Sequence, residues 1–246
     1  DEMGVPANVY NFGRCNFMST QERILFEKLI LEGHVPDVAI FIDGLNDFSH
    51  WHGEPVYTKD LRKFMHGGRI PPYYKVLREF PIMKVLESFS AERLDDSKQS
   101  PHGKKARNKD DEIRIIRTVI ERYRTNKKMT EAIAAAFGVT PIFIWQPVPT
   151  HQYDPKFNIY DGFDYENNMP YLKRGYELMA EAVRSNPLGK NFIWCADIQK
   201  DLKEPLYVDA YHYSAKMTQM MTHYILDAMK QRDLLPSQEG AVARLR

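Results

Sequence analysis

Residues 38–47, VAIFIDGLND, join an unbroken apolar run of strand length to a polar loop. A run of this length without polar alternation predicts a strand covered on both faces, as in a parallel sheet. Similar apolar runs occupy residues 139–145 and 192–196, and each is followed by a loop. The three runs predict the middle of a parallel sheet whose strands all end in loops at one edge.

Helical patterns separate these strands. Apolar positions at helical spacing predict helices from Ser19 to Gly33, from Asp110 to Gly138, over 171–184 and over 215–230. The first is expected to begin with Ser19 as N-cap and Glu22 as its capping-box partner. Residues 8–12 predict a further short buried strand that ends at Gly13. Alternation of strands and helices indicates an α/β fold with helices on both faces of the sheet.

The length of 246 residues suits a single domain of this kind. We expect one domain over residues 1–246, with a helical and loop insertion at about 48–110 and a frayed tail from about 236. Thirty-four basic and 33 acidic side chains leave a net charge of +1. The overall charge of the protein therefore does not favour binding to nucleic acid. No apolar run reaches the roughly 18 residues of a membrane span.

The two cysteines cannot form a disulfide framework. They fit a cytoplasmic protein, and they also fit an exported or membrane-anchored one whose leader is absent from this sequence. The localisation is therefore left open.

Glycines and polar residues that could take part in chemistry follow three of the predicted strands. Open parallel sheets form their sites in the loops at the carboxyl ends of the strands. These residues are Gly13, Gly44, Asn46, Asp47, Asp209 and His212. In this order they resemble conserved blocks of the SGNH (GDSL-like) serine hydrolase superfamily over nearly the whole chain. Gly13 resembles the glycine of the family's second block. Residues 44–47 match the third block, Gly-x-Asn-Asp. Residues 209–212 match the fifth block, Asp-x-x-His.

The resemblance implies a flavodoxin-like three-layer α/β/α sandwich and hydrolysis of an ester through an acyl-enzyme, with no cofactor or metal. His212 would be the general base, and Asp209 would hold its imidazole in the correct tautomer. The backbone N–H of Gly13 and the side-chain amide of Asn46 would donate to the oxyanion.

The remaining loop residues have supporting roles in this interpretation. Gly44 allows the sharp turn, and Asp47 holds the loop around Asn46 through its own hydrogen bonds. Trp51 and His52 are expected to line a substrate cleft. A zinc site that uses both histidines of residues 50–52 together with His212 is a further alternative.

The family's nucleophile, a serine in a Gly-Asp-Ser-like block, lies upstream of the second block, but the twelve residues before Gly13 contain no serine. In the flavodoxin-like strand order 2-1-3-4-5, the first strand lies between strands two and three. We therefore expect an upstream or separate N-terminal segment to fill a slot of about 9–10 Å between residues 8–12 and 38–42 and to bring the serine. Ser19 and Ser214 are better explained as helix starts.

The substrate class stays open at this stage. A carbohydrate O-acetyl group, a lipid or another small acyl ester fits the residues, and so does acyl transfer to a sugar. The rival from another class is a non-catalytic SGNH-like binding or scaffold protein.

Overall fold

The structure, a computed structural model, describes residues 7–52, 106–160 and 162–235. The chain divides into two compact units, residues 1–53 with 108–246 and residues 54–107. Only the last two residues of the second unit are described. Most of the predicted insertion at about 48–110 and the predicted frayed tail from 236 therefore lie outside the described residues.

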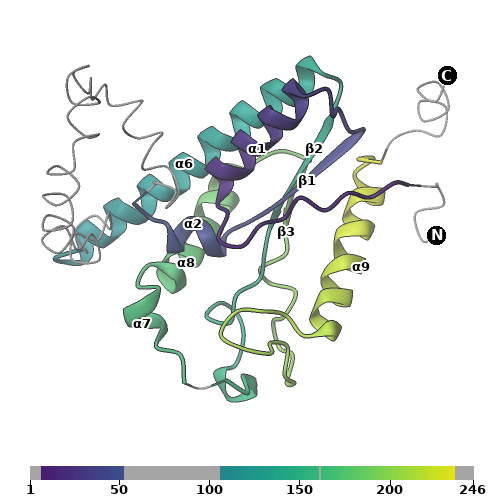
Figure 1. The fold of residues 1–246 in the computed structure, drawn as a ribbon. Coiled ribbons are helices and arrows are strands. Elements are labelled where there is room, and N and C mark those ends of the chain that lie inside the picture. Colours follow the sequence, from purple (N-terminus) through teal and green to yellow (C-terminus); the bar gives the residue numbers. More distant parts are fainter. Residues whose placement is uncertain (1–6, 53–105, 161, 236–246) are drawn as a thin grey trace, which may run out of the picture. The chain divides into compact units, whose positions relative to one another are not determined.

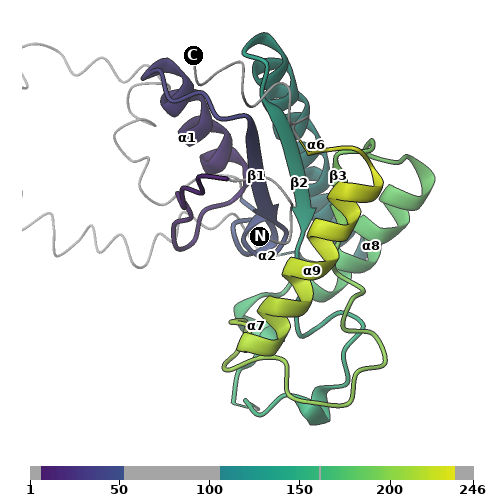
Figure 2. The ribbon, with the colours of Figure 1, turned by 90° about the vertical axis from the view of Figure 1, so that its right-hand side faces the viewer.

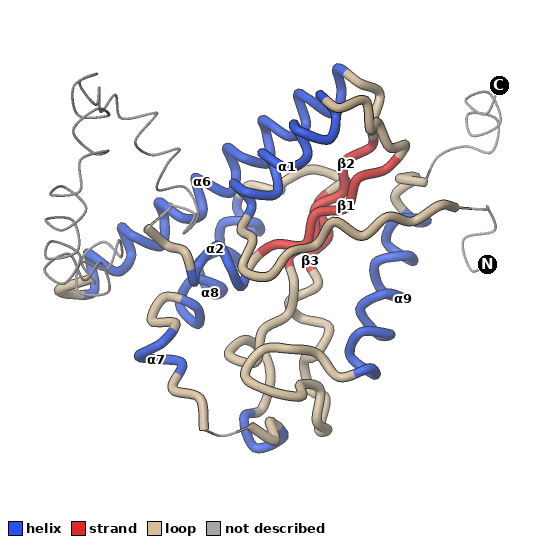
Figure 3. Tube along the Cα trace, viewed as in Figure 1, coloured by secondary structure: helices blue, strands red, loops and turns tan. Residues whose placement is uncertain are grey.

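A parallel sheet forms the centre of the described unit (Figure 3). Its strands are β1 (Val38–Asp43), β2 (Thr140–Trp145) and β3 (Phe192–Trp194), in the order β1-β2-β3. Ile40 lies opposite Ile142, and Phe143 lies opposite Phe192. The predicted α/β class with a parallel sheet is confirmed.

Helices cover both faces of this sheet, α9 on one side and α1, α6 and α8 on the other (Figure 1). The helices are α1 (Ser19–Leu31), α2 (Leu45–Ser49), α6 (Lys109–Ala136), α7 (Tyr165–Asn168), α8 (Leu172–Ser185) and α9 (Ala215–Gln231), with a short 3-10 turn, η2, at Pro155–Phe157. As predicted, Gly33 and Gly138 follow the ends of α1 and α6 with positive φ. Across the described ranges, no helix combines the length and apolar character that crossing a membrane requires.

Alternate residues of each strand enter two different cores. Ile144 and Ile193 pack against α9, where Met221 and Ile225 are buried with them. The opposite face is aromatic, and Trp145 is its centre, with rings of Tyr123, Phe48 and Tyr176 around it. Burial on both faces explains why β2 and β3 show no polar alternation.

The prediction of a strand over residues 8–12 is wrong. This segment is irregular, and Val9 and Tyr10 are 84% and 76% exposed. Among the described residues it pairs with no strand, so it does not form the second side of the expected slot. Instead β1 lies at the edge of the sheet (Figure 2) and pairs there only with β2. Ile40 and Ile42 on this edge strand are 49% and 43% exposed.

The start of α1 also differs from the prediction by one residue. Met18, not Ser19, is the N-cap, and its backbone N–H donates to Oε1 of Gln21 at 3.0 Å. The Ser19 hydroxyl instead turns into the protein and is buried. The shift moves Glu22 from the predicted cap to the interior face of the helix.

A tight contact between α2 and α8 gives a test of this packing. A methyl group on Gly175 would lie 2.5 Å from Cε1 of the buried Phe48. We expect Gly175→Ala to destabilise the fold by about 1–3 kcal/mol through overpacking, although alanine favours a helix more than glycine does. Urea unfolding measures the change. The control is Gly162→Ala, which has open space around the new methyl; equal stability of the two variants would contradict the contact.

Candidate functional site

His212 and Asp209 form a hydrogen-bonded pair in the loop before α9. Imidazole Nδ1 lies 2.6 Å from Oδ2 of Asp209, as predicted. The other carboxylate oxygen accepts backbone N–H groups from Tyr211 at 2.9 Å and from His212 at 2.8 Å. The N–H of Tyr211, followed by the imidazole and N–H of His212, lowers the pKa of Asp209 to about 2. Near neutral pH the carboxylate is therefore ionised and holds the ring.

The loop that carries this pair is fixed at both ends. The N–H of Val208 donates to the carbonyl of His212 at 2.9 Å, and the N–H of Ser214 donates to the carbonyl of Leu206 at 2.9 Å. The Ser214 hydroxyl caps α9 by accepting the N–H of Met217. The His212 side chain remains 64% exposed, and its Nε2 has no hydrogen-bond partner among the described residues, so this nitrogen is open to a ligand.

The segment after β2 is hydrogen-bonded to this loop, to α8 and, through the N–H of Gln146 and the carbonyl of Asp43 at 3.0 Å, to the end of β1. Tyr213 donates to the carbonyl of Pro147 at 2.8 Å, and Tyr176 donates to the carbonyl of Gln146 at 2.9 Å. The Tyr176 hydroxyl also occupies the space where a side chain at Gly44 would begin. The loops that follow the strands leave the sheet at one edge (Figure 3), so the predicted site loops share a hydrogen-bonded base.

Gly44 is required by the backbone at the end of β1. Its φ of 127° is a conformation that other L-residues rarely adopt, and a Cβ would clash with Tyr176 and Trp145. The predicted loop-shaping role of this glycine is therefore consistent with the geometry.

The next residues anchor this turn to the rest of the fold. Asn46 Nδ2 donates to the carbonyl of Phe17 at 2.7 Å. Asp47 is fully buried, and its carboxylate accepts the hydroxyl of Ser19 at 2.6 Å. The Ser19 oxygen in turn accepts Nδ2 of Asn126 at 3.1 Å. The carboxylate of Asp47 thus joins this loop to α1 through Ser19, rather than through the Asx-type bonds within the loop that the sequence suggested.

Arg122 of α6 completes the anchor, and the sequence analysis did not single it out. Its guanidinium donates to the carbonyl oxygens of Asp47 and His50 at 3.0 Å and of Trp51 at 3.1 Å. These carbonyls belong to the C-terminal part of α2 and the residues after it, which need donors. Arg122 is one of several arginines in a long charged helix, so nothing in the sequence distinguishes it as the residue that holds this turn.

The backbone N–H of Gly13 is hydrogen-bonded within its own segment. The N–H of Gly13 donates to Oδ1 of Asn11 at 2.8 Å. Four residues later, Phe17 accepts the amide of Asn46. Asn46 is therefore bonded to the segment that follows Gly13, while the N–H of Gly13 is occupied by Asn11.

Residues 50–52 show packing rather than a metal site. The Trp51 ring lies edge-on to Tyr171 at 5.1 Å between centroids, and the rings of His50 and His52 are 6.0 Å apart. Among the residues that the structure describes, no group of three His, Cys, Asp or Glu side chains is arranged to hold a metal. The described residues therefore do not support the alternative of a zinc site.

A second histidine–carboxylate pair lies in the loops that follow the carboxyl ends of the strands. Nε2 of His151, in the loop after β2, is 2.8 Å from Oδ1 of Asp197, in the loop after β3. His151 is buried, with its ring against Tyr176 and Trp194. The sequence analysis missed this pair, although its own rule about strand-end loops applies to both residues. Because the imidazole is buried, the pair joins two loops rather than facing a substrate.

The serines within the chain have other partners. Ser19 is buried against Asp47, and Ser214 caps α9. Within the described ranges no serine hydroxyl is hydrogen-bonded to His212, so neither residue is placed as its nucleophile.

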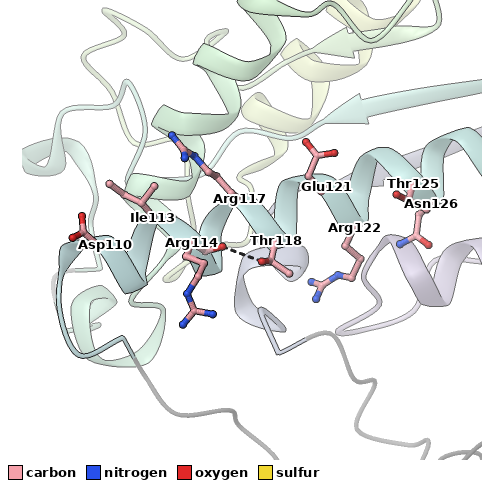
Figure 4. Close-up of a pocket in the computed structure, with 9 residues that line it drawn as sticks. All are labelled: Asp110, Ile113, Arg114, Arg117, Thr118, Glu121, Arg122, Thr125 and Asn126. Atoms are coloured by element: carbon pink, nitrogen blue, oxygen red, sulfur yellow. Dashed lines mark hydrogen bonds between the residues drawn. The ribbon is translucent and has the colours of Figure 1, made fainter.

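A hollow of about 900 Å³ runs along α6 (Figure 4). Its described lining consists of Asp110, Ile113, Arg114, Arg117, Thr118, Glu121, Arg122, Thr125 and Asn126. All of them belong to a single helix, and neither His212 nor Asn46 is among them. The hollow is therefore separate from the chemistry of the strand-end loops.

Comparison of the chain with protein-family models, curated proteins and solved structures found no match. The site is consequently interpreted from its geometry and from the sequence motifs alone.

The acidity of Asp209 provides a test of the pair. Carboxyl-carbon NMR should give a midpoint of about 2 for Asp209, well below the ordinary value of 3.8. In His212→Ala the midpoint should rise but stay below 3.8, because both backbone N–H donors remain. His34→Ala, a distant exposed histidine, is the control. An ordinary midpoint in the wild-type protein would contradict the geometry of the loop.

Proposed function

We propose that the chain is the greater part of an SGNH-type serine hydrolase that cleaves an acyl or O-acetyl ester of a small molecule or carbohydrate. The observation that carries the proposal is the His212–Asp209 hydrogen bond, which leaves imidazole Nε2 exposed in a loop that is hydrogen-bonded to Pro147 after β2. An ionised Asp209 favours the tautomer in which Nε2 accepts a proton. This is the arrangement a general base needs.

In the proposed reaction a serine hydroxyl attacks the ester carbonyl while His212 accepts its proton. The carbon–oxygen bond to the leaving alcohol breaks, and His212 returns the proton to that alcohol. Water then attacks the acyl-serine, again with His212 as base, and releases the acid. No cofactor or metal enters the scheme.

The tetrahedral intermediate needs donors aimed at its oxyanion. Asn46 Nδ2 carries two hydrogens, and Phe17 accepts one of them, so the second is available for this role. The N–H of Gly13 would have to exchange Oδ1 of Asn11 for the substrate oxygen. Binding of substrate would therefore rearrange residues 11–13.

The open edge of β1 supports a source for the nucleophile. A strand added in parallel to this edge would pair with the backbone N–H and C=O groups of β1 and would end beside Gly44 and Asn46. We propose that an upstream or separate N-terminal segment supplies this strand and carries the serine at its end. The sequence encoded before residue 1 is the direct test: a Gly-x-Ser motif after an apolar run is expected, and its absence would favour the non-catalytic rival.

Activity of the full-length protein tests the residue roles. With a p-nitrophenyl ester, His212→Ala should lose nearly all turnover, because triad members act as a unit. Asn46→Ala should lower kcat by about 10²–10³ if its amide is an oxyanion donor. His34→Ala is the matched control, and circular dichroism checks that all variants fold. Turnover near the wild-type rate in His212→Ala would overturn the mechanism.

A further inference from the structure

Three carboxyl groups lie buried beneath the loop that carries Asn46. Glu22 comes from α1, Asp43 is the last residue of β1, and Asp47 lies in α2. Asp43 and Asp47 are buried, and oxygen Oε2 of Glu22 is buried although part of that residue is exposed. Such a concentration of acid groups away from water is costly unless each is paired or neutral.

Their surroundings compensate only one of the three. Asp47 accepts the Ser19 hydroxyl and faces the guanidinium of Arg122, whose charge opposes the effect of burial. Lys127 lies nearby, but its ammonium donates to Glu131 and Asn191. Glu22 and Asp43 are left facing each other within hydrogen-bonding reach.

A small cavity of about 10 Å³ adjoins these two carboxyls. This is room for one water molecule. The cavity lining includes Glu22, Asp43 and Tyr123. Oε2 of Glu22, Oδ1 of Asp43 and the hydroxyl of Tyr123 are all buried without a hydrogen-bond partner among the described residues. Three unsatisfied polar atoms around such a space require a bridging group.

We propose that Glu22 and Asp43 share one proton, that a buried water bridges them to Tyr123, and that this shared proton positions the end of β1 and the Asn46 loop. One carboxyl donates its O–H to the other, so the pair carries one negative charge instead of two. Glu22 is then a positioning residue that acts through Asp43 on the adjacent Gly44 turn.

The charge of the pair sets the direction of its pH dependence. Burial, and then the charge of Asp47, raises the pKa of Glu22 from 4.5 to about 8, and burial raises that of Asp43 as well. Because the folded state keeps a proton that the unfolded state releases above 4.5, its stability falls as pH rises toward 8. Above 8, a second negative charge repels Asp43 and Asp47 and loosens the turn.

Glu22→Gln tests the shared proton without changing the volume. In the wild-type protein the urea midpoint should fall between pH 5 and 8, and in Glu22→Gln this fall should be lost. Glu32→Gln, an exposed glutamate after the same helix, should keep the wild-type slope. Asp43→Asn replaces Glu22→Gln if that variant fails to fold. A slope that persists in both variants overturns the proposal.

Infrared spectroscopy tests the protonation of these carboxyls directly, and a purely structural role for them would not produce the expected signal. Wild-type protein at pH 7 should show the carbonyl band of a buried protonated carboxylic acid, and Glu22→Gln and Asp43→Asn should lack it. A band that remains in both variants contradicts the shared proton. A crystal structure of the full-length protein should show one water bound to Tyr123 and the two carboxyls; an empty cavity overturns the bridge.

The effect on catalysis rests on the proposed function. For the full-length esterase, kcat/KM should fall roughly tenfold per pH unit above about 8, and Glu22→Gln should remove this alkaline limb while Glu32→Gln keeps it. An alkaline limb that persists in Glu22→Gln would contradict the link to the Asn46 loop. If no esterase activity exists at all, the proposed function fails, while the stability and infrared results still decide the shared proton.

Discussion

The described fold depends on the contact between the guanidinium of Arg122 and the end of α2. Three backbone carbonyls accept hydrogen bonds from this one side chain, and the buried carboxylate of Asp47 faces its charge. Through it the longest helix holds the turn that presents Asn46. Removing the guanidinium would leave three carbonyls without their donor and a buried carboxylate without the positive charge it faces, a larger loss than one ordinary hydrogen bond. The position of the candidate oxyanion donor is therefore set by a residue 76 positions away in the sequence.

Local patterns predicted the parts of the fold that depend on local chemistry. The parallel strands could be recognised from their unbroken apolar runs, and Gly33 and Gly138 marked the ends of two helices because the chain there needs positive φ. The segment at residues 8–12, with Val9, Tyr10 and Phe12, was also expected to be a strand, but it pairs with no strand among the described residues. A strand is stabilised by its neighbours, so pattern alone gave the wrong answer for this segment.

The same distinction separates the predicted from the unpredicted parts of the candidate site. Asp209 and His212 are three residues apart, so one loop brings them together and their sequence spacing is informative. The pair of His151 and Asp197, by contrast, joins loops 46 residues apart. The group of Glu22 and Asp43 likewise joins a helix to the end of a strand. Ser19 looked like a helix cap because serine favours that position, and only the fold reveals that its hydroxyl serves Asp47.

The edge of β1, which no other described strand pairs with, also bears on how the polypeptide behaves in solution. An uncovered edge strand presents a row of free N–H and C=O groups that can template pairing with another molecule. Residues 38–43 are apolar apart from one aspartate, contain no proline and favour β structure, which is the composition of aggregation-prone segments. Where no other segment pairs with this edge, the polypeptide should self-associate in a concentration-dependent manner. A lysine at Ile40 or Ile42 would act as a gatekeeper and raise solubility.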